Sequence, residues 1–154
     1  MILVVDDFAD GARALSYLLM SRGATSHPVF SGPEALAMMR EAPPTEPLLV
    51  ILDEMMPEMS GLEVLRAIQA DPKLRRAVVV MFSAAVDPAR EAEARQLGAA
   101  AWFEKGAMRG RDATVLVRSM LAFYPLAEAS ARIAAPNTPP STVTSSSPHL
   151  ADPA

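Results

Sequence analysis

The chain has 154 residues, of which 51% are hydrophobic and 21% charged, and its formal net charge is −4. This composition is typical of one globular domain, and the negative charge argues against direct binding of nucleic acid or of anionic membranes. The absence of cysteine excludes disulfides, thiolate metal sites and a cysteine nucleophile. No apolar stretch reaches the roughly 18–20 residues of a membrane span, and no secretory signal pattern is present, so we expect a cytoplasmic protein.

Short apolar runs alternate with segments of helical periodicity, which is the pattern of βαβ units in a parallel sheet. Five such runs occur, at 2–5, 24–30, 48–52, 78–82 and 100–104. The second run contains Pro28, which lacks a hydrogen-bond donor and therefore favours a sheet edge. The pattern predicts an α/β fold of the flavodoxin-like (βα)5 type, a doubly wound parallel sheet with strand order 2-1-3-4-5, in which the second strand is an edge.

The segments between the runs carry signals for helix ends. Ser60 and Glu63 have the spacing of a capping box, and Asp87-Pro88 provides a cap followed by a proline at the first helical position. The helix that starts at Pro88 contains only one large apolar residue, Leu97, before Gly98. We therefore expect this helix to dock weakly on the sheet.

The composition changes after residue 124, where the last predicted helix ends. Residues 136–154 are mostly Pro, Ser, Thr and Ala, and such a segment buries too little surface to offset the entropy lost on ordering. We expect one domain over 1–124 and a mostly disordered tail over 125–154, apart from a short Ala-rich helical extension at 126–135. Because no second domain is expected, the output should run through contact with another protein.

Polar residues follow four of the predicted strands. Asp6 and Asp7 follow the first run, Asp53 the third, Ser83 the fourth and Lys105 the fifth. In an open α/β sheet, ligands bind outside the carboxyl ends of the strands, so these groups should face one pocket. Converging carboxylates either raise the pKa of one of the group or recruit a hard cation, for which Mg²⁺ with phosphate oxygens is a good match. Taken one at a time, each residue has an ordinary explanation as a turn residue, helix cap or surface charge. Their joint placement favours a site.

Several segments resemble the motifs of response-regulator receiver domains. The segment Asp53 to Gly61, DEMMPEMSG, resembles the phosphoacceptor motif D-x-x-M-P-x-M-x-G of that family. Val5-Asp6-Asp7-Phe8 is similar to its acidic pair, and Phe82-Ser83-Ala84 to the hydroxyl that ends its fourth strand. The segment 98–105 resembles its fifth strand with the terminal lysine, and 32–36 the start of its second helix. The resemblance covers residues 1–124 and implies a stand-alone receiver domain.

The resemblance implies a phosphoacceptor and a metal site. Asp53 would take a phosphoryl group from a histidine kinase or a histidine phosphotransferase. Asp7, Asp53 and the backbone carbonyl of Met55 would bind Mg²⁺, or Mn²⁺, directly, and Asp6 would hold the ion through water.

The resemblance also implies how the signal leaves the site. Ser83 and Lys105 would contact the phosphoryl oxygens, and the small Ala84 would leave room for the group. Trp102 would be the aromatic switch that turns inward when Ser83 moves. The chain would then act as a switch and not as an enzyme, changing its binding to an unknown downstream protein through the face of the fourth helix, fifth strand and fifth helix. It would be a monomer or a dimer promoted by phosphorylation.

Two residues depart from the family pattern. Gly106 stands where a proline usually follows the lysine, which predicts a looser lysine loop, and Glu54 puts a charge beside the acceptor that could weaken donor approach or contact a partner. These departures motivate a second hypothesis, a phospho-independent interaction domain. A third is an aspartyl-phosphate phosphatase, but its second acid is replaced by Met55. Flavin mononucleotide binding is a weaker rival, because the acidic pair would repel its phosphate.

Overall fold

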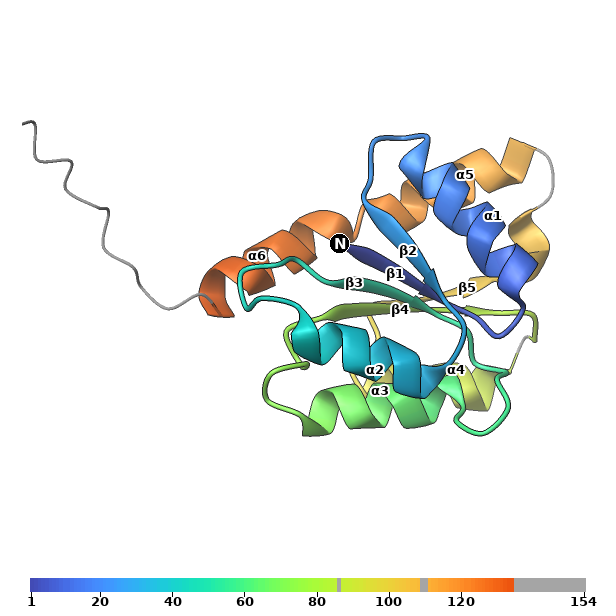
Figure 1. The fold of residues 1–154 in the computed structure, drawn as a ribbon. Helices are drawn as coiled ribbons and strands as arrows, with labels where there is room; N and C mark the ends of the chain where they lie inside the picture. The colour runs from blue at the N-terminus through green and yellow to red at the C-terminus, as the bar shows by residue number, and fades with distance from the viewer. Residues whose placement is uncertain (86, 109–110, 135–154) are drawn as a thin grey trace, which may run out of the picture.

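The computed structural model describes residues 1–85, 87–108 and 111–134 and contains a five-stranded parallel sheet (Figure 1). The strands are β1 (Ile2–Val5), β2 (Ser26–Val29), β3 (Leu49–Leu52), β4 (Val78–Ser83) and β5 (Ala101–Glu104). Their order is β2-β1-β3-β4-β5, which confirms the predicted fold class and strand order. The edge position of β2 also agrees with Pro28, because an edge strand needs fewer ladder donors.

Helices cover both faces of the sheet (Figure 1). They are α1 (Ala9–Met20), α2 (Gly32–Glu41), α3 (Gly61–Ala70), α4 (Pro88–Gln96), α5 (Arg111–Leu121) and α6 (Tyr124–Ala134), with a 3-10 turn η1 (Lys105–Met108) after β5. The expected N-terminal caps are present: Ser60 and Glu63 form a complete capping box, and the Asp87 side chain accepts hydrogen bonds from the first turn of α4. Among the described residues, no helix has the length and apolar character needed to cross a bilayer.

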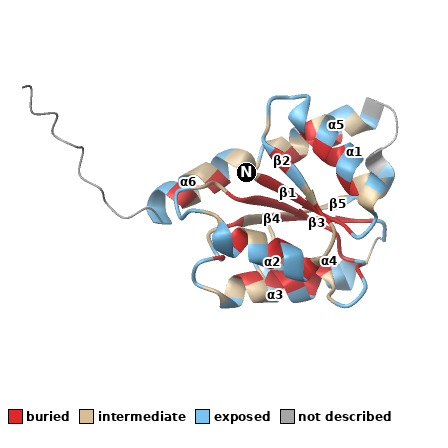
Figure 2. Cartoon of the chain, viewed as in Figure 1, coloured by how far each residue is buried: buried red, intermediate tan, exposed pale blue. Residues whose placement is uncertain are grey.

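Alternate residues of β1, β3 and β4 contribute to two separate apolar cores. Leu3 and Val5 point to the core shared with α2, α3 and α4, whereas Ile2 and Val4 point to the core shared with α1 and α5. The central strands are buried along their whole length, as Figure 2 shows in red. A parallel sheet covered on both faces requires such continuous apolar runs.

The strand register places the carboxyl ends of the central strands side by side, at one end of the sheet. Val5 pairs with Leu52 in the neighbouring strand, and Leu52 pairs with Met81. The residues that follow β1 and β3 therefore emerge side by side, and those that follow β4 and β5 emerge next to them. This end of the sheet carries the polar residues singled out from the sequence.

Helix α6 packs at the other end of the sheet, where the strands begin, near the N-terminus (Figure 1). Ala127 and Ala131 are buried, and the Tyr124 hydroxyl accepts a hydrogen bond of 3.0 Å from the amino group of Met1. The sequence predicts a short helix at 126–135, and the structure has one that begins at Tyr124 and is packed on the domain. Residues 135–154, which include most of the predicted disordered tail, lie outside the described residues, so the predicted domain boundary stays a prediction.

Candidate functional site

Three carboxylates meet at the carboxyl end of the sheet. Asp6, Asp7 and Asp53 each offer an oxygen, and these oxygens all lie within 4.8 Å of one another. Strand hydrogen bonds fix two of the backbones, since the Asp6 amide donates to Val29 at 3.0 Å and the Asp53 amide donates to Val5 at 2.9 Å. Asp6 and Asp53 are buried and Asp7 is exposed, so the cluster has a buried base and an open side.

Lys105 joins this cluster from the end of β5. Its Nζ donates a hydrogen bond of 2.6 Å to Oδ2 of Asp6 and lies 3.2 Å from Oδ1 of Asp53. The ammonium group also lies 5.8 Å from the centre of the Phe82 ring, a cation–π contact with β4. The sequence prediction that lysine and the acids converge on one spot is therefore met by the geometry.

The carboxyl of Asp53 lies in surroundings that disfavour its negative charge. Burial raises the pKa of its carboxyl above the usual range; Lys105 opposes this effect, and the negative charge of Asp6 adds to it. Although Lys105 is close enough for an ion pair, Oδ1 of Asp53 has no hydrogen-bond partner among the described residues. The ammonium group of Lys105 nevertheless offsets part of the cost of burying the charge of Asp53.

The donor set fits a hard divalent cation. All three side chains offer carboxylate oxygens, which Mg²⁺ and Ca²⁺ prefer, and no sulfur or imidazole is among them. Asp7 is exposed, so an ion from solvent can reach the cluster on this side. The residues present therefore fit the magnesium site that the sequence implies.

Ser83 and Ala84 lie where β4 ends, between the strands that lead to Asp53 and Lys105. Ser83 is completely buried, and its Oγ accepts a hydrogen bond of 3.3 Å from the Ala85 amide. Ala84 is exposed and adds no bulk at this end of the sheet. Their assigned contacts with a phosphoryl group remain predictions.

Trp102 lies in β5 opposite Met81 of β4 and is partly exposed. It packs against the apolar core beneath α2, α3 and α4. The side chain of Met55 is 60% exposed at the mouth of the site. The switch role of Trp102 and the ligand role of the Met55 carbonyl also remain predictions.

Glu54 is the residue whose role the sequence did not reveal. Its side chain does not face the approach to Asp53; it is 1% exposed and turned toward the helices. Oε2 accepts a hydrogen bond of 2.8 Å from the Leu62 amide at the start of α3, and Oε1 forms an ion pair with Arg90 of α4. Neither contact has a local sequence signal, because the Leu62 amide is eight residues away and Arg90 is 36 residues away.

Gly61 shows how closely α3 approaches the site. A β-carbon at this position would overlap the carbonyl oxygen of Asp53 and lie 2.9 Å from the α-carbon of Glu54. Only glycine fits such a close backbone approach without displacing one of the two segments. The start of α3 therefore lies against the backbone of Asp53 and of its buried neighbour Glu54.

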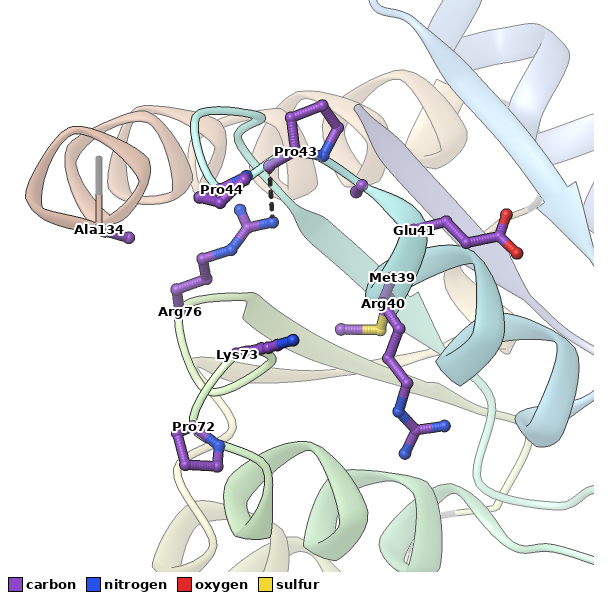
Figure 3. A pocket seen from close by; sticks show the side chains of 10 residues that line it. Met39, Arg40, Glu41, Pro43, Pro44, Pro72, Lys73, Arg76 and Ala134 are labelled. Atoms are coloured by element: carbon purple, nitrogen blue, oxygen red, sulfur yellow. Dashed lines mark hydrogen bonds between the residues drawn. The ribbon is translucent and has the colours of Figure 1, made fainter. Parts of the chain in front are cut away.

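A pocket of about 470 Å³ lies at the other end of the sheet, where Met39, Arg40 and Lys73 are among the lining residues (Figure 3). The guanidinium of Arg76 crosses it and donates to the backbone carbonyls of Pro43, at 2.9 Å, and Glu46. These two hydrogen bonds connect Arg76 to the loop before β3. The residues that line the pocket include none of the acidic cluster.

Comparison with known proteins identifies the family. A family model described as the response regulator receiver domain matches residues 2–112. The chain is 38% identical over 86 residues to the DNA-binding response regulator MtrA of Mycobacterium tuberculosis, a match that covers 56% of this chain and 35% of that protein. It is 37% identical over 83 residues to the response regulator PleD of Caulobacter vibrioides, covering 54% of this chain and 18% of PleD. The chain thus spans about a third or less of the length of these relatives.

Solved structures agree with this match. The chemotaxis protein CheY4 of Vibrio cholerae superposes with a TM-score of 0.67 at 25% identity, covering 80% of this chain and 96% of CheY4. A sensor protein from Polaromonas sp. JS666 superposes with a TM-score of 0.66 at 27% identity, covering 82% and 96% of the two chains. The chain therefore belongs to the family of response regulator receiver domains, the switch modules of two-component signalling.

Proposed function

We propose that the chain is a phosphorylation-controlled switch that accepts a phosphoryl group on Asp53 from a histidine kinase or a histidine phosphotransferase. The observation that carries this proposal is the arrangement of Asp53 itself. It is buried beside Asp6 and the exposed Asp7, and its Oδ1 lies 3.2 Å from the ammonium group of Lys105. In the transfer, one oxygen of Asp53 forms a P–O bond as the P–N bond of phosphohistidine breaks, and the imidazole nitrogen keeps the electron pair.

Mg²⁺, or Mn²⁺, would supply charge neutralisation for the transferred group. In our proposal Asp7, Asp53 and the backbone carbonyl of Met55 hold the ion directly, and Asp6 holds it through water. The hydrogen bond between Lys105 and Asp6 supports the outer role of Asp6, because one of its oxygens is already in use. Asp7 is exposed, with its oxygen free to face an incoming ion.

The signal would leave the site through β4 and β5. Ser83 and Lys105 would contact the phosphoryl oxygens, Ala84 would leave them room, and Trp102 would change its packing as Ser83 moves. The small buried area of α4 supports this route, because a weakly docked helix can change position at low cost. The face formed by α4, β5 and α5 would then bind a downstream protein, with the chain acting in the cytoplasm as a monomer or as a phosphorylation-promoted dimer.

Fluorine NMR of beryllofluoride, which mimics a phosphoryl group on aspartate, tests this proposal. We expect bound fluorine signals that require both Mg²⁺ and Asp53, and their loss in Asp53→Ala. The variant must remain folded, which far-UV circular dichroism checks. A folded wild-type protein without bound signals would overturn the proposal and favour the phospho-independent interaction domain, and steady hydrolysis of small phosphomonoesters would favour the phosphatase.

A further inference from the structure

Helix α4 buries little apolar surface and carries two ion pairs to neighbouring elements. Of its residues Pro88–Gln96, all of which the structure describes, Ala94 alone is buried. Two ion pairs attach the helix to its neighbours: Arg66 of α3 with Glu93, and Glu54 of the β3–α3 loop with Arg90. The two pairs differ in environment, because both partners of the first are about half exposed whereas Glu54 is 1% exposed.

Glu54 is also the central hydrogen-bond acceptor of the loop that carries Asp53. Its carbonyl oxygen accepts from the amides of Gly61, at 3.0 Å, and Met56, at 3.2 Å. Its side chain accepts from the Leu62 amide at 2.8 Å. The residue directly after the acceptor is thus bound to the start of α3 through both its backbone and its side chain, and Arg90 is the cation that faces its buried carboxylate.

Arg90 lies close in sequence to Ser83, the residue that ends β4 near the acidic cluster. Arg90 lies in the first turn of α4, where its amide donates 3.1 Å to the capping carboxylate of Asp87. Asp87 is four residues from Ser83, which ends β4 at the site. The pair Glu54–Arg90 therefore links the loop after Asp53 directly to the start of the helix that follows Ser83.

We propose that Glu54 and Arg90 are positioning residues that couple the docking of α4 to the reactivity of Asp53. With α4 in place, Arg90 neutralises the buried carboxylate of Glu54; when α4 moves away, an unpaired negative charge is left one residue from the acceptor. Such a charge opposes the gain of a phosphoryl group, because phosphorylation adds further negative charge to the same loop. Coupling of this kind is reciprocal, so modification of Asp53 strengthens the docking of α4 by the same factor. This inference rests on the proposed function.

A double-mutant cycle on beryllofluoride affinity in the presence of Mg²⁺ tests the coupling. We expect Arg90→Ala to weaken the affinity roughly tenfold, within the usual range of site–site coupling. Arg90→Lys keeps the charge but loses the guanidinium geometry, so we expect a smaller loss. Glu54→Gln keeps an acceptor for the Leu62 amide and removes the charge, so the double variant Glu54→Gln/Arg90→Ala should recover the affinity of Glu54→Gln alone.

The second ion pair provides the matched control. Arg66→Ala breaks the other link between α3 and α4 without touching the loop of Asp53, and we expect affinity within about twofold of the wild type, as for an exposed pair. Thermal melting checks that each variant is folded. If Arg90→Ala does not fold, the beryllofluoride affinities of Arg90→Lys and of the double variant still test the coupling.

The outcomes separate the two proposals. If the wild type binds beryllofluoride and Arg90→Ala weakens binding equally with and without the Glu54→Gln substitution, or not at all, the coupling is wrong and the phosphoacceptor site stands. An equal loss in Arg66→Ala would also contradict it, because general loosening of α4 would then be the cause. If the folded wild type does not bind beryllofluoride, both proposals fall.

Discussion

Helices α3 and α4 lie side by side on the same face of the sheet but are held there by different forces. Five residues of α3 are buried, Gly61, Leu62, Val64, Leu65 and Ile68, and its N-terminus has a complete capping box. In α4, Ala94 is the one buried residue, and two ion pairs link the helix to its neighbours. The comparison contrasts a helix docked by apolar burial with one that buries a single small side chain.

The energies explain the difference. Full burial of a Leu or Ile side chain is worth about 1.5–3 kcal/mol, whereas an exposed ion pair contributes about 0–1 kcal/mol. Apolar burial also does not depend on a specific partner atom, so α3 stays in place when its surroundings change. Two of the contacts of α4 are ion pairs, so we expect its docking to be more sensitive than that of α3 to a change of charge nearby.

The largest expected effect comes from truncating the core of each helix. Leu65→Ala removes a side chain with 0% exposure and should lower the free energy of unfolding by about 2–4 kcal/mol. Leu97→Ala, at the end of α4, removes a partly exposed side chain and should cost about 1 kcal/mol. Urea unfolding followed by the fluorescence of Trp102, the single tryptophan, measures both. Equal losses would contradict the contrast between the helices.

A second test adds a methyl group where α3 meets the acceptor. Gly61→Ala should destabilise the protein by about 1–3 kcal/mol, because the new β-carbon overlaps the Asp53 carbonyl oxygen and one segment must shift. It should also weaken Mg²⁺-dependent beryllofluoride binding, measured on the folded fraction. Gly106→Ala is the matched control, since a β-carbon there meets no atom within 4 Å, and unchanged stability in both variants would contradict the close approach.

High salt should separate the two helices without any mutation. Screening at 1 M salt shortens the Debye length to about 3 Å, which weakens the exposed pair Arg66–Glu93. We expect the amides of α4 to exchange with solvent a few times faster, whereas those of α3 keep their protection because burial is not screened. Hydrogen-exchange mass spectrometry at low and high salt measures both helices in one sample, and equal acceleration would argue against ionic docking.

The smallest expected effect is the loss, at low pH, of the stability that Glu63 contributes to the N-terminal cap of α3. Hydrogen bonds from the Ser60 backbone and side chain lower the pKa of the Glu63 carboxyl below its usual range. Because the folded pKa is lowered, the stabilisation is present at neutral pH and is lost as pH falls through the folded value. The stability difference between wild type and Glu63→Gln should therefore be constant near neutral pH and shrink in acid. A difference that grows on acidification would contradict this sign.

The sequence was sufficient for the regular parts of the molecule. Continuous apolar runs predicted the central strands, Pro28 predicted an edge, and the Ser60–Glu63 spacing predicted a capping box, because each signal is local to a few neighbouring residues. The convergence of Asp6, Asp53 and Lys105 was also predictable, since parallel strands direct their carboxyl ends to one end of the sheet.

The sequence by itself thus determined the sheet, its order and the family, and with them the place of the acidic site. What only the tertiary structure decided is where the charge of Glu54 goes. A glutamate after the acceptor is compatible with a solvent-facing side chain and with a buried one, and the choice depends on the α3 amide and on Arg90, which is 36 residues away. Local patterns encode hydrogen bonds and periodicity within an element, whereas an ion pair between two loops and helices exists only after the chain has brought them together.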